Sequence, residues 1–252
     1  MRNKPVAAAA AVVALLSAAI APAWAEPVKN IVLVHGAFAD GSGWKPVAQI
    51  LRKDGYTVSI VQEPETSLAD DVAATNRILD RQSGPAVLVG HSYGGAVITE
   101  AGNNAHVASL VYVAAFAPDE GEKIGPLLGS IAPAQKSIGP TADGYLLIDP
   151  AKFHADFAAD VPAAVAEFMA ISQVPVNGSI LGTPTTAPAW KTKPSYGIVA
   201  TQDREINPDL ERSMYKRAGA KMTEIKGSHA VFISKPNDVA RVIERAAKAS
   251  AQ

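Results

Sequence analysis

The chain contains no cysteine among its 252 residues. This absence excludes disulfide bonds, a thiol nucleophile, thiolate zinc sites and cysteine-ligated iron–sulfur clusters. Charge is also scarce, with 19% charged residues and a formal net charge of −1, so the chain offers no general basic field for nucleic acid. Hydrophobic residues make up 48%, which is too many for a disordered chain. These figures predict a globular protein without a nucleic-acid partner.

The first 25 residues have the pattern of a secretory signal peptide. Arg2 and Lys4 supply a positive start, the 14 residues from 7 to 20 are apolar apart from one serine, and Ala23-Trp24-Ala25 gives a small-x-small cleavage pattern. A membrane span needs about 20 apolar residues, so we expect no stable membrane anchor. The sequence therefore predicts an exported protein, periplasmic or secreted, whose residues 26–252 form a single domain.

Beyond the signal pattern, short apolar runs alternate with helix-like segments. The expected strands are 31–34, 56–61, 86–89, 108–116, 196–200 and 221–225, and the expected helices are 44–53, 67–81, 94–101, 208–218 and 237–247. Strands that alternate with helices predict an α/β fold with a mainly parallel six-stranded sheet and helices on both faces.

The alternation breaks between residues 119 and 190. These 72 residues contain seven glycines and eight prolines, with two short amphipathic stretches near 153–157 and 163–171. A structureless loop of that length is improbable inside a compact domain. We therefore expect an insertion that lies over the sheet.

The chain carries the pattern G-x-S-x-G at Gly90-His91-Ser92-Tyr93-Gly94. The pentapeptide directly follows an apolar strand and opens a helix. A sharp strand-to-helix turn needs small residues around its centre, and it projects the Ser92 hydroxyl above the sheet. The helix N-terminus adds a positive partial charge where an oxyanion would form. The setting predicts a nucleophilic serine, with an idle serine in a glycine-rich turn as the alternative.

A serine hydroxyl is a poor nucleophile until a base takes its proton. His229 follows the last predicted strand, in a loop that returns to the sheet edge where Ser92 lies. Asp203 follows the penultimate strand, at the edge where ligand chemistry gathers in open α/β sheets. The order Ser92, Asp203, His229 is that of a serine-acid-histidine triad. The carboxylates that compete with Asp203 for the role of the acid are Asp119, Glu205 and Asp209.

A tetrahedral intermediate also needs two N–H donors. The candidates for this oxyanion hole are the backbone N–H groups of Ala37, in the loop after the first strand, and of Tyr93. No histidine–carboxylate cluster has metal-ligand spacing in the sequence, so we expect no metal. The aromatic candidates for lining a pocket are Phe38, Tyr93, Phe153, Phe157, Phe168 and Trp190.

These residues resemble the α/β-hydrolase superfamily, and within it the small serine esterases related to plant methyl esterases and hydroxynitrile lyases. The resemblance spans roughly residues 30 to 245 and rests on 32–37 with 43–44, 90–95, 200–203 and 227–229. It implies an α/β-hydrolase fold with a cap at about 119–190, which covers the active site. It also implies that neither a metal nor an organic cofactor takes part.

Within that subgroup, similar lyases carry a threonine where this chain has Gly36 and a lysine where it has Ala230. The resemblance therefore favours hydrolysis of a small carboxylic ester through an acyl-enzyme intermediate. The alternatives are a cofactor-free perhydrolase or a C–C or C–CN lyase on the same site, or a non-catalytic ligand-binding relative. The natural ester and the oligomeric state stay open.

Overall fold

The main sheet has six parallel strands in the order β2-β1-β3-β4-β8-β9. The computed structural model describes Met1 and residues 28–250, so the predicted signal peptide falls, apart from Met1, outside the described residues. The parallel six-stranded sheet predicted from the sequence is confirmed. Its strands are β1 (Asn30–Val34), β2 (Thr57–Ile60), β3 (Ala86–Ser92), β4 (Val107–Ala115), β8 (Ser195–Ala200) and β9 (Lys221–Ile225).

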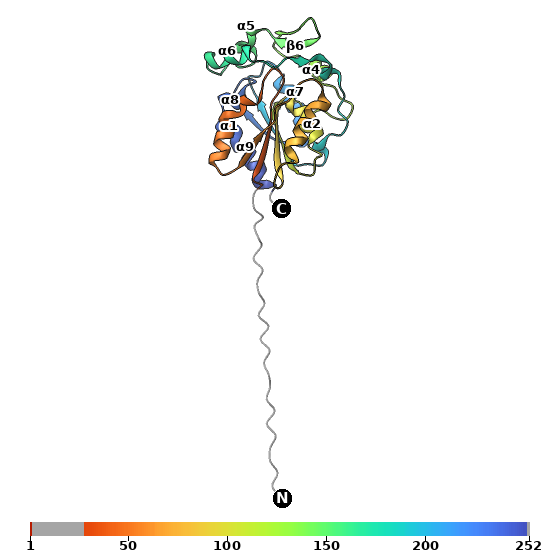
Figure 1. Cartoon of the computed structure of the whole chain (residues 1–252), viewed down its shortest axis with the longest axis vertical. Helices are drawn as coiled ribbons and strands as arrows, with labels where there is room; N and C mark the ends of the chain where they lie inside the picture. Colours follow the sequence, from red (N-terminus) through yellow and green to blue (C-terminus); the bar gives the residue numbers. More distant parts are fainter. Residues whose placement is uncertain (2–27, 251–252) are drawn as a thin grey trace.

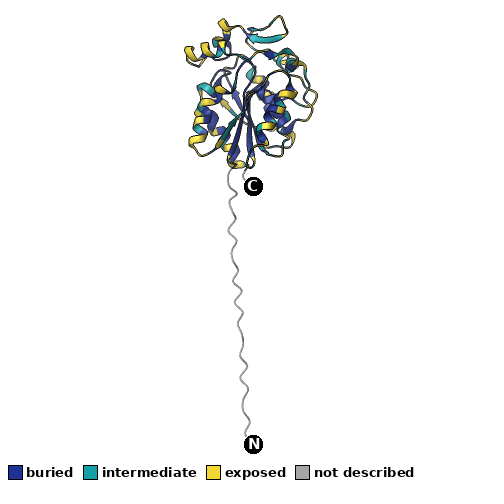
Figure 2. Cartoon of the chain, viewed as in Figure 1, coloured by how far each residue is buried: buried dark blue, intermediate teal, exposed yellow. Residues whose placement is uncertain are grey.

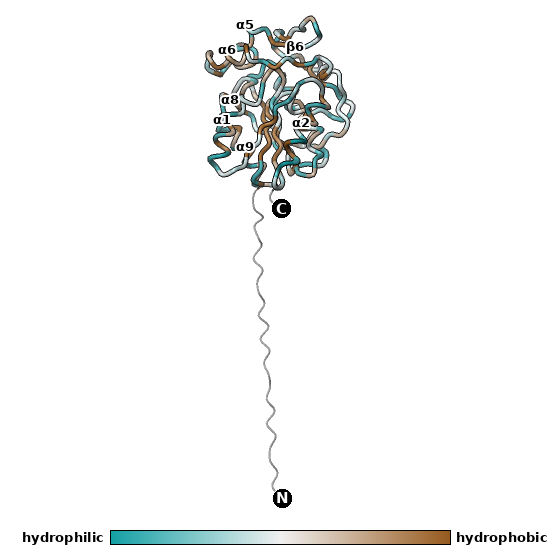
Figure 3. Tube along the Cα trace, viewed as in Figure 1, coloured by the Kyte–Doolittle hydropathy of each residue, from teal (hydrophilic) through white to brown (hydrophobic). Residues whose placement is uncertain are grey.

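The inner strands are mainly apolar because helices cover both of their faces. Every residue of β1, β3 and β8 is buried, whereas the edge strands β2 and β9 are largely exposed or half-buried. Figure 2 shows the dark blue of burial concentrated in the centre of the sheet, and Figure 3 shows the hydrophobic colour there. Burial of these apolar runs is the main force that holds the sheet together.

Helices lie on both sides of the sheet (Figure 1). One side carries α1, α8 and α9, which pack on one another, and the other carries α2, α3 and α7. Their bounds are α1 (Lys45–Lys53), preceded by the short helix η1 (Gly41–Trp44), α2 (Leu68–Leu79), α3 (Gly94–Ala101), α7 (Pro208–Arg217), α8 (Val231–Ser234) and α9 (Pro236–Ala249).

Two helix starts follow directly from the sequence. The Ser67 hydroxyl accepts a hydrogen bond from the Asp70 N–H at 3.1 Å, as expected of a serine N-cap. Asn207 caps α7 in the same way, accepting from the Asp209 N–H at 3.0 Å, and Pro208 occupies the first helical position.

We call residues 119–190 the cap segment. It leaves the sheet after β4 and returns to it at β8, and Figure 1 shows α5, α6 and β6 gathered at one end of the molecule, away from the C-terminus. Its strands form an antiparallel sheet in the order β5-β6-β7. Its elements are α4 (Ile124–Ser130), β5 (Ile138–Pro140), β6 (Tyr145–Ile148), α5 (Pro150–Asp156), α6 (Ala163–Ile171), β7 (Val176–Asn177), η2 (Gly178–Gly182) and η3 (Ala189–Lys191).

The connection order creates a switch point next to β1. The chain passes from β1 to β2 on one side and then to β3 on the other, so the loops after β1 and β3 diverge. In open α/β sheets, ligands bind at the carboxyl ends of the strands at such a point. None of the helices within the described residues is long and apolar enough to span a membrane.

Candidate active site

Ser92 occupies the sharp turn between β3 and α3. Its φ angle is +51°, in the left-handed region that non-glycine residues rarely adopt. The close packing of this turn explains its glycines, since a Cβ on Gly90 would collide with the Gly94 carbonyl and one on Gly94 with the His35 carbonyl. The turn therefore holds Ser92 in a strained conformation at the carboxyl end of the sheet.

His229 and Asp203 form a buried pair beside this turn. His229 Nδ1–H donates to Asp203 Oδ2 over 2.6 Å, and both side chains are almost fully buried. Asp203 Oδ1 in turn accepts from the N–H groups of Glu205 at 2.7 Å and Ile206 at 2.9 Å. These bonds place the proton of His229 on Nδ1 and leave Nε2 free to act as a base.

Opposing effects set the acidity of His229. Burial lowers its pKa, but the charge of Asp203 and the hydrogen bond to that carboxylate act in the opposite direction. The net result is a pKa above the ordinary value of 6.5. The ring therefore gains a proton more readily than an isolated histidine does.

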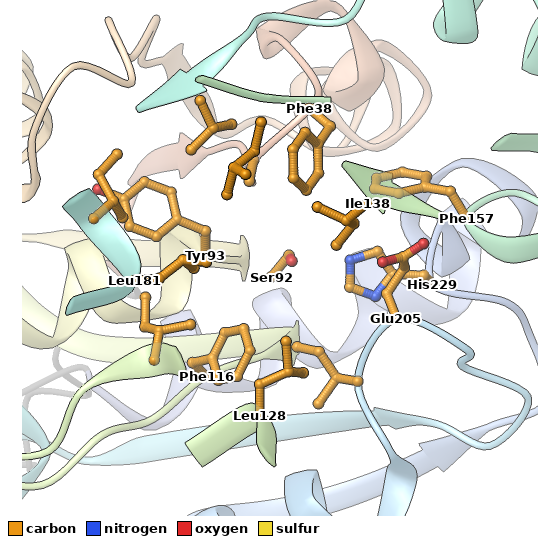
Figure 4. A pocket seen from close by; sticks show the side chains of 16 residues that line it. Phe38, Ser92, Tyr93, Phe116, Leu128, Ile138, Phe157, Leu181, Glu205 and His229 are labelled. Atoms are coloured by element: carbon orange, nitrogen blue, oxygen red, sulfur yellow. The ribbon is translucent and has the colours of Figure 1, made fainter. Parts of the chain in front are cut away.

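Figure 4 shows Ser92 with its oxygen on the side that faces the His229 ring. In the described part of the chain His229 is hydrogen-bonded to Asp203, and no hydrogen bond joins His229 to Ser92. Such contacts are often long in free enzymes and shorten when substrate binds. The fold thus brings Ser92, Asp203 and His229 together from three separate loops.

His91, the residue before Ser92, contacts the backbone of His229. Its Nε2 lies 3.0 Å from the backbone carbonyl of His229, and its ring packs against Phe232 with centroids 4.4 Å apart. Burial holds the pKa of His91 well below 6.5, so the ring is neutral and Nε2–H donates to that carbonyl. This contact could not be predicted from a local sequence pattern, because it joins residues 138 positions apart.

The loop after β1 comes close to Ser92. A Cβ on Gly36 would lie 2.6 Å from the Ser92 Cβ, so only glycine fits there. Ala37 and Tyr93, predicted as oxyanion donors, both line the cavity at Ser92. Within residues 28–250 no hydrogen bond uses the backbone N–H of either residue. Both groups are therefore available to a ligand.

Ser92 and His229 open into a narrow, mostly apolar cavity of about 60 Å³ beneath the cap segment (Figure 4). Of the aromatic residues predicted to line a pocket, Tyr93, Phe38 and Phe157 form part of the cavity wall. Phe116, which the sequence analysis does not include, also lines it. Three others do not line it. Phe153 stacks on Phe157, Phe168 is 64% exposed on α6, and Trp190 donates its ring N–H to the Pro118 carbonyl at 2.8 Å.

The three carboxylates that compete with Asp203 do not occupy its position beside His229 Nδ1. Asp119 contacts Lys191 Nζ at 2.7 Å near the surface, and that ion pair holds the pKa of Asp119 below its ordinary value. Asp209 is 72% exposed and pairs with Arg212. Glu205 lines the cavity without a bond to His229 Nδ1, which is taken by Asp203.

A cluster of buried acids, which the sequence analysis does not predict, lies behind the loop that follows β1. Glu63, Glu65 and Asp71 are buried around His35, and the Tyr93 hydroxyl donates to Asp71 Oδ2 at 2.6 Å. Glu63 and Glu65 have carboxylate oxygens without hydrogen-bond partners among the described residues. Burial raises the pKa of Glu65 to about 7 although His35 opposes it, and raises that of Glu63 well above 4.5.

The ligand atoms of His35, Glu63 and Glu65 all lie within 4.8 Å of one another, a grouping that could hold a metal ion. Both ring nitrogens of His35 nevertheless already make hydrogen bonds. Its Nε2 accepts from the Glu63 N–H at 2.9 Å, and its Nδ1–H points to the Gly36 carbonyl at 3.1 Å. A metal on Nδ1 would displace the proton from that nitrogen while Nε2 acts as an acceptor, so the ring would have to become an imidazolate anion. The cluster fits protonated carboxyl groups better than a cation.

Replacing Glu65 with glutamine should stabilise the protein only at higher pH. The folded-state pKa of Glu65 is about 7 against 4.5 for the free group. The contribution of the protonated side chain to the free energy of unfolding is therefore fully present below pH 4.5 and is lost as pH rises through 7. The lost part is roughly 3 kcal/mol. Urea unfolding should therefore give similar stabilities at pH 4.5 and a more stable variant at pH 8.

The control for this experiment is Glu167→Gln, which makes the same chemical change on the exposed face of α6. A stability difference between Glu65→Gln and wild type that stays constant from pH 4.5 to 8 would contradict a titrating buried Glu65.

Comparisons with known proteins agree with this fold. The profile of the alpha/beta hydrolase family matches residues 31–242. A carbendazim hydrolyzing esterase from a Nocardioides species is 34% identical over 123 residues, which are 43% of this chain and 50% of that protein. The chain thus matches half the length of this relative. An alpha/beta hydrolase of Aspergillus novofumigatus is 25% identical over 86% of this chain and 96% of its own length.

Among solved structures, a pyrethroid hydrolase from Sphingobium faniae superposes with a TM-score of 0.75 at 23% identity, covering 88% of this chain and 98% of that one. An extracellular alpha/beta-hydrolase from a Paenibacillus species has a TM-score of 0.72 at 18% identity, covering 86% and 98%. At these identities the likeness is one of fold.

Proposed function

The chain belongs to the alpha/beta hydrolase family, and from this premise we propose that it is a serine hydrolase of small carboxylic esters. The observation that carries the proposal is the buried His229–Asp203 pair beside Ser92, at the wall of one apolar cavity. The esterase named among its relatives supports the same chemistry.

In the proposed reaction Ser92 Oγ attacks the acyl carbon while His229 Nε2 takes its proton. The oxyanion of the tetrahedral intermediate accepts hydrogen bonds from the N–H groups of Ala37 and Tyr93. When the intermediate collapses, His229 returns the proton to the leaving alcohol. His229 then activates water to release the acid from Ser92, and Asp203 keeps the imidazole in the required tautomer throughout.

The cavity wall supports the choice of substrate class. It is lined mainly by hydrocarbon side chains of the sheet loops and of the cap segment, including Phe38, Phe116 and Leu181. A charged acid or alcohol would lose its hydration there without a partner. An uncharged ester of small size therefore fits this site best.

The proposal is tested with short p-nitrophenyl esters and a serine-directed organophosphate. We expect hydrolysis of the acetate and butyrate, complete inhibition by the organophosphate, and a covalent adduct that peptide mass spectrometry locates on Ser92. An inhibited enzyme with the adduct on another residue, or an intact protein that hydrolyses neither ester, would reject the proposed function.

The pH dependence of kcat/KM follows from His229. Because the neutral ring is the base, activity should be lost as pH falls through the His229 pKa, which lies above 6.5. The acidic limb of the profile should therefore have its midpoint above pH 6.5. A flat profile from pH 5 to 8, with a substrate whose acylation is rate-limiting, would contradict the role of His229.

We also propose that the protein is exported. Support for this comes from residues 1–25, with their positive start, apolar run and cleavage pattern. An ester hydrolase without cysteine would function in an oxidising compartment without risk of thiol oxidation.

A further inference from the structure

Glu205 is a buried carboxyl group in the cavity wall that the proposed reaction does not use. It is 6% exposed, and Figure 4 shows it next to the His229 ring. Its Oε1 is enclosed and has no hydrogen-bond partner within the described residues. A buried polar group of this kind costs free energy unless something inside the cavity bonds to it.

The other polar side chains of the wall are already engaged or reacting. The Tyr93 hydroxyl donates to Asp71, and His229 Nδ1–H donates to Asp203. Ser92 is the proposed nucleophile. Glu205 is therefore the wall residue whose side chain has unused hydrogen-bonding capacity and no part in the chemistry.

The surroundings of Glu205 favour its protonated form. Burial is the largest effect, the positive groups His229 and Arg204 oppose it, and the negative groups Asp203 and Asp156 add to it. Together they raise the pKa of Glu205 to about 8. At neutral pH the side chain is a carboxylic acid whose O–H can donate a hydrogen bond into an apolar cavity.

The position of Glu205 indicates which part of a substrate it meets. His229 must reach the leaving oxygen of the ester to protonate it, so the alcohol half lies on the His229 side of the cavity. Glu205 lies on the same side, two residues after Asp203. The acyl half, held at Ser92 and the two N–H donors, lies further from Glu205 than the alcohol half does.

We infer that Glu205 is a specificity residue that donates a hydrogen bond to an ether or carbonyl oxygen in the alcohol half of the ester, beyond the ester group itself. The inference rests on the proposed ester hydrolysis and names its substrate class: esters whose alcohol carries a second, uncharged oxygen. A plain alkyl ester of the same length would leave the carboxyl group unpaired when it fills the cavity.

The test uses 2-methoxyethyl acetate and n-butyl acetate, which share the acyl group and differ in one ether oxygen. The ratio of their kcat/KM values is measured for wild type, Glu205→Leu and Glu205→Gln. Intrinsic reactivity cancels when the ratios are compared between enzymes. At pH 7 the preference for the ether should fall about three- to tenfold in Glu205→Leu, the worth of one neutral hydrogen bond. Glu205→Gln keeps a donor and should retain the preference.

The pH dependence of this ratio separates a hydrogen-bond donor from a merely structural residue. In wild type the preference should decline as pH rises through about 8, because an ionised Glu205 has no proton to donate. In Glu205→Gln the preference should not decline. Glu63→Gln is the matched control, since it removes another buried acid outside the cavity wall, and it should keep the wild-type ratio and its decline.

An unchanged ratio in folded Glu205→Leu, or the same decline with pH in Glu205→Gln, would overturn the inference and leave the proposed ester hydrolysis standing. If Glu205→Leu does not fold, the pH comparison between wild type and Glu205→Gln decides alone. A wild-type enzyme that hydrolyses neither acetate, nor the p-nitrophenyl esters, would reject both the proposed function and this inference.

Discussion

Replacing Ser92 with alanine should lower kcat for ester hydrolysis by about 10⁶, the loss found when the nucleophile of a serine protease is removed. The substitution deletes only the hydroxyl that attacks the acyl carbon. Ser92 Oγ makes no hydrogen bond within the described residues, and alanine is small enough for the tight turn between β3 and α3. The melting temperature should therefore change little while the activity disappears.

Hydrolysis of a p-nitrophenyl ester and thermal unfolding of the same preparation check this result together. Ser83→Ala is the matched control, because it removes a hydroxyl from an exposed turn just before β3. A folded Ser92→Ala protein with near-normal turnover would show that the nucleophile lies elsewhere.

The sharp turn at Ser92 could be predicted because its signal is local in the sequence. An apolar strand, G-x-S-x-G and a helix start occupy about a dozen consecutive residues, and the crowding around Gly90 and Gly94 explains why each glycine is required. The strands and helices of the main sheet were predictable for the same reason. Their apolar periodicity reflects burial on two faces or one.

The acid cluster around His35 left no comparable signal. Glu63 and Glu65 lie in a polar stretch after β2 that reads as a solvated loop, because glutamate is rarely buried without a partner. Only the fold brings them to His35 and Asp71. The small antiparallel sheet of the cap segment escaped prediction because its strands have two to four residues, too few to show a period.

Side-chain direction was the other limit. Six aromatic residues were candidates for the pocket, and composition could not separate those that face the cavity from those that pack inside the cap segment or face solvent. Phe157 and Phe153 lie on one helical turn and stack at 4.8 Å, yet only Phe157 lines the cavity. Such distinctions depend on how α5 is rotated above the sheet.

Replacing Asp203 with asparagine should lower kcat by about 10⁴, although the side chain keeps its shape. The hydrogen bonds of Asp203 explain why. Its Oδ1 accepts from the N–H groups of Glu205 and Ile206, so the amide oxygen of asparagine will take that position. The amide NH₂ then faces His229 Nδ1, which must accept instead of donate. The proton moves to Nε2, and the ring can no longer act as a base toward Ser92.

Asp119→Asn and Asp209→Asn are the matched controls, because both make the same substitution at carboxylates that the sequence alone could not exclude. Each is engaged in an ion pair near the surface, with Lys191 and Arg212 respectively, and each should retain kcat within a few-fold of wild type. The three variants are compared at a pH well above the His229 pKa, after their folding is verified by circular dichroism. If Asp119→Asn is the inactive variant and Asp203→Asn turns over normally, the assignment of the acid is wrong, while the roles of Ser92 and His229 remain to be judged by their own tests.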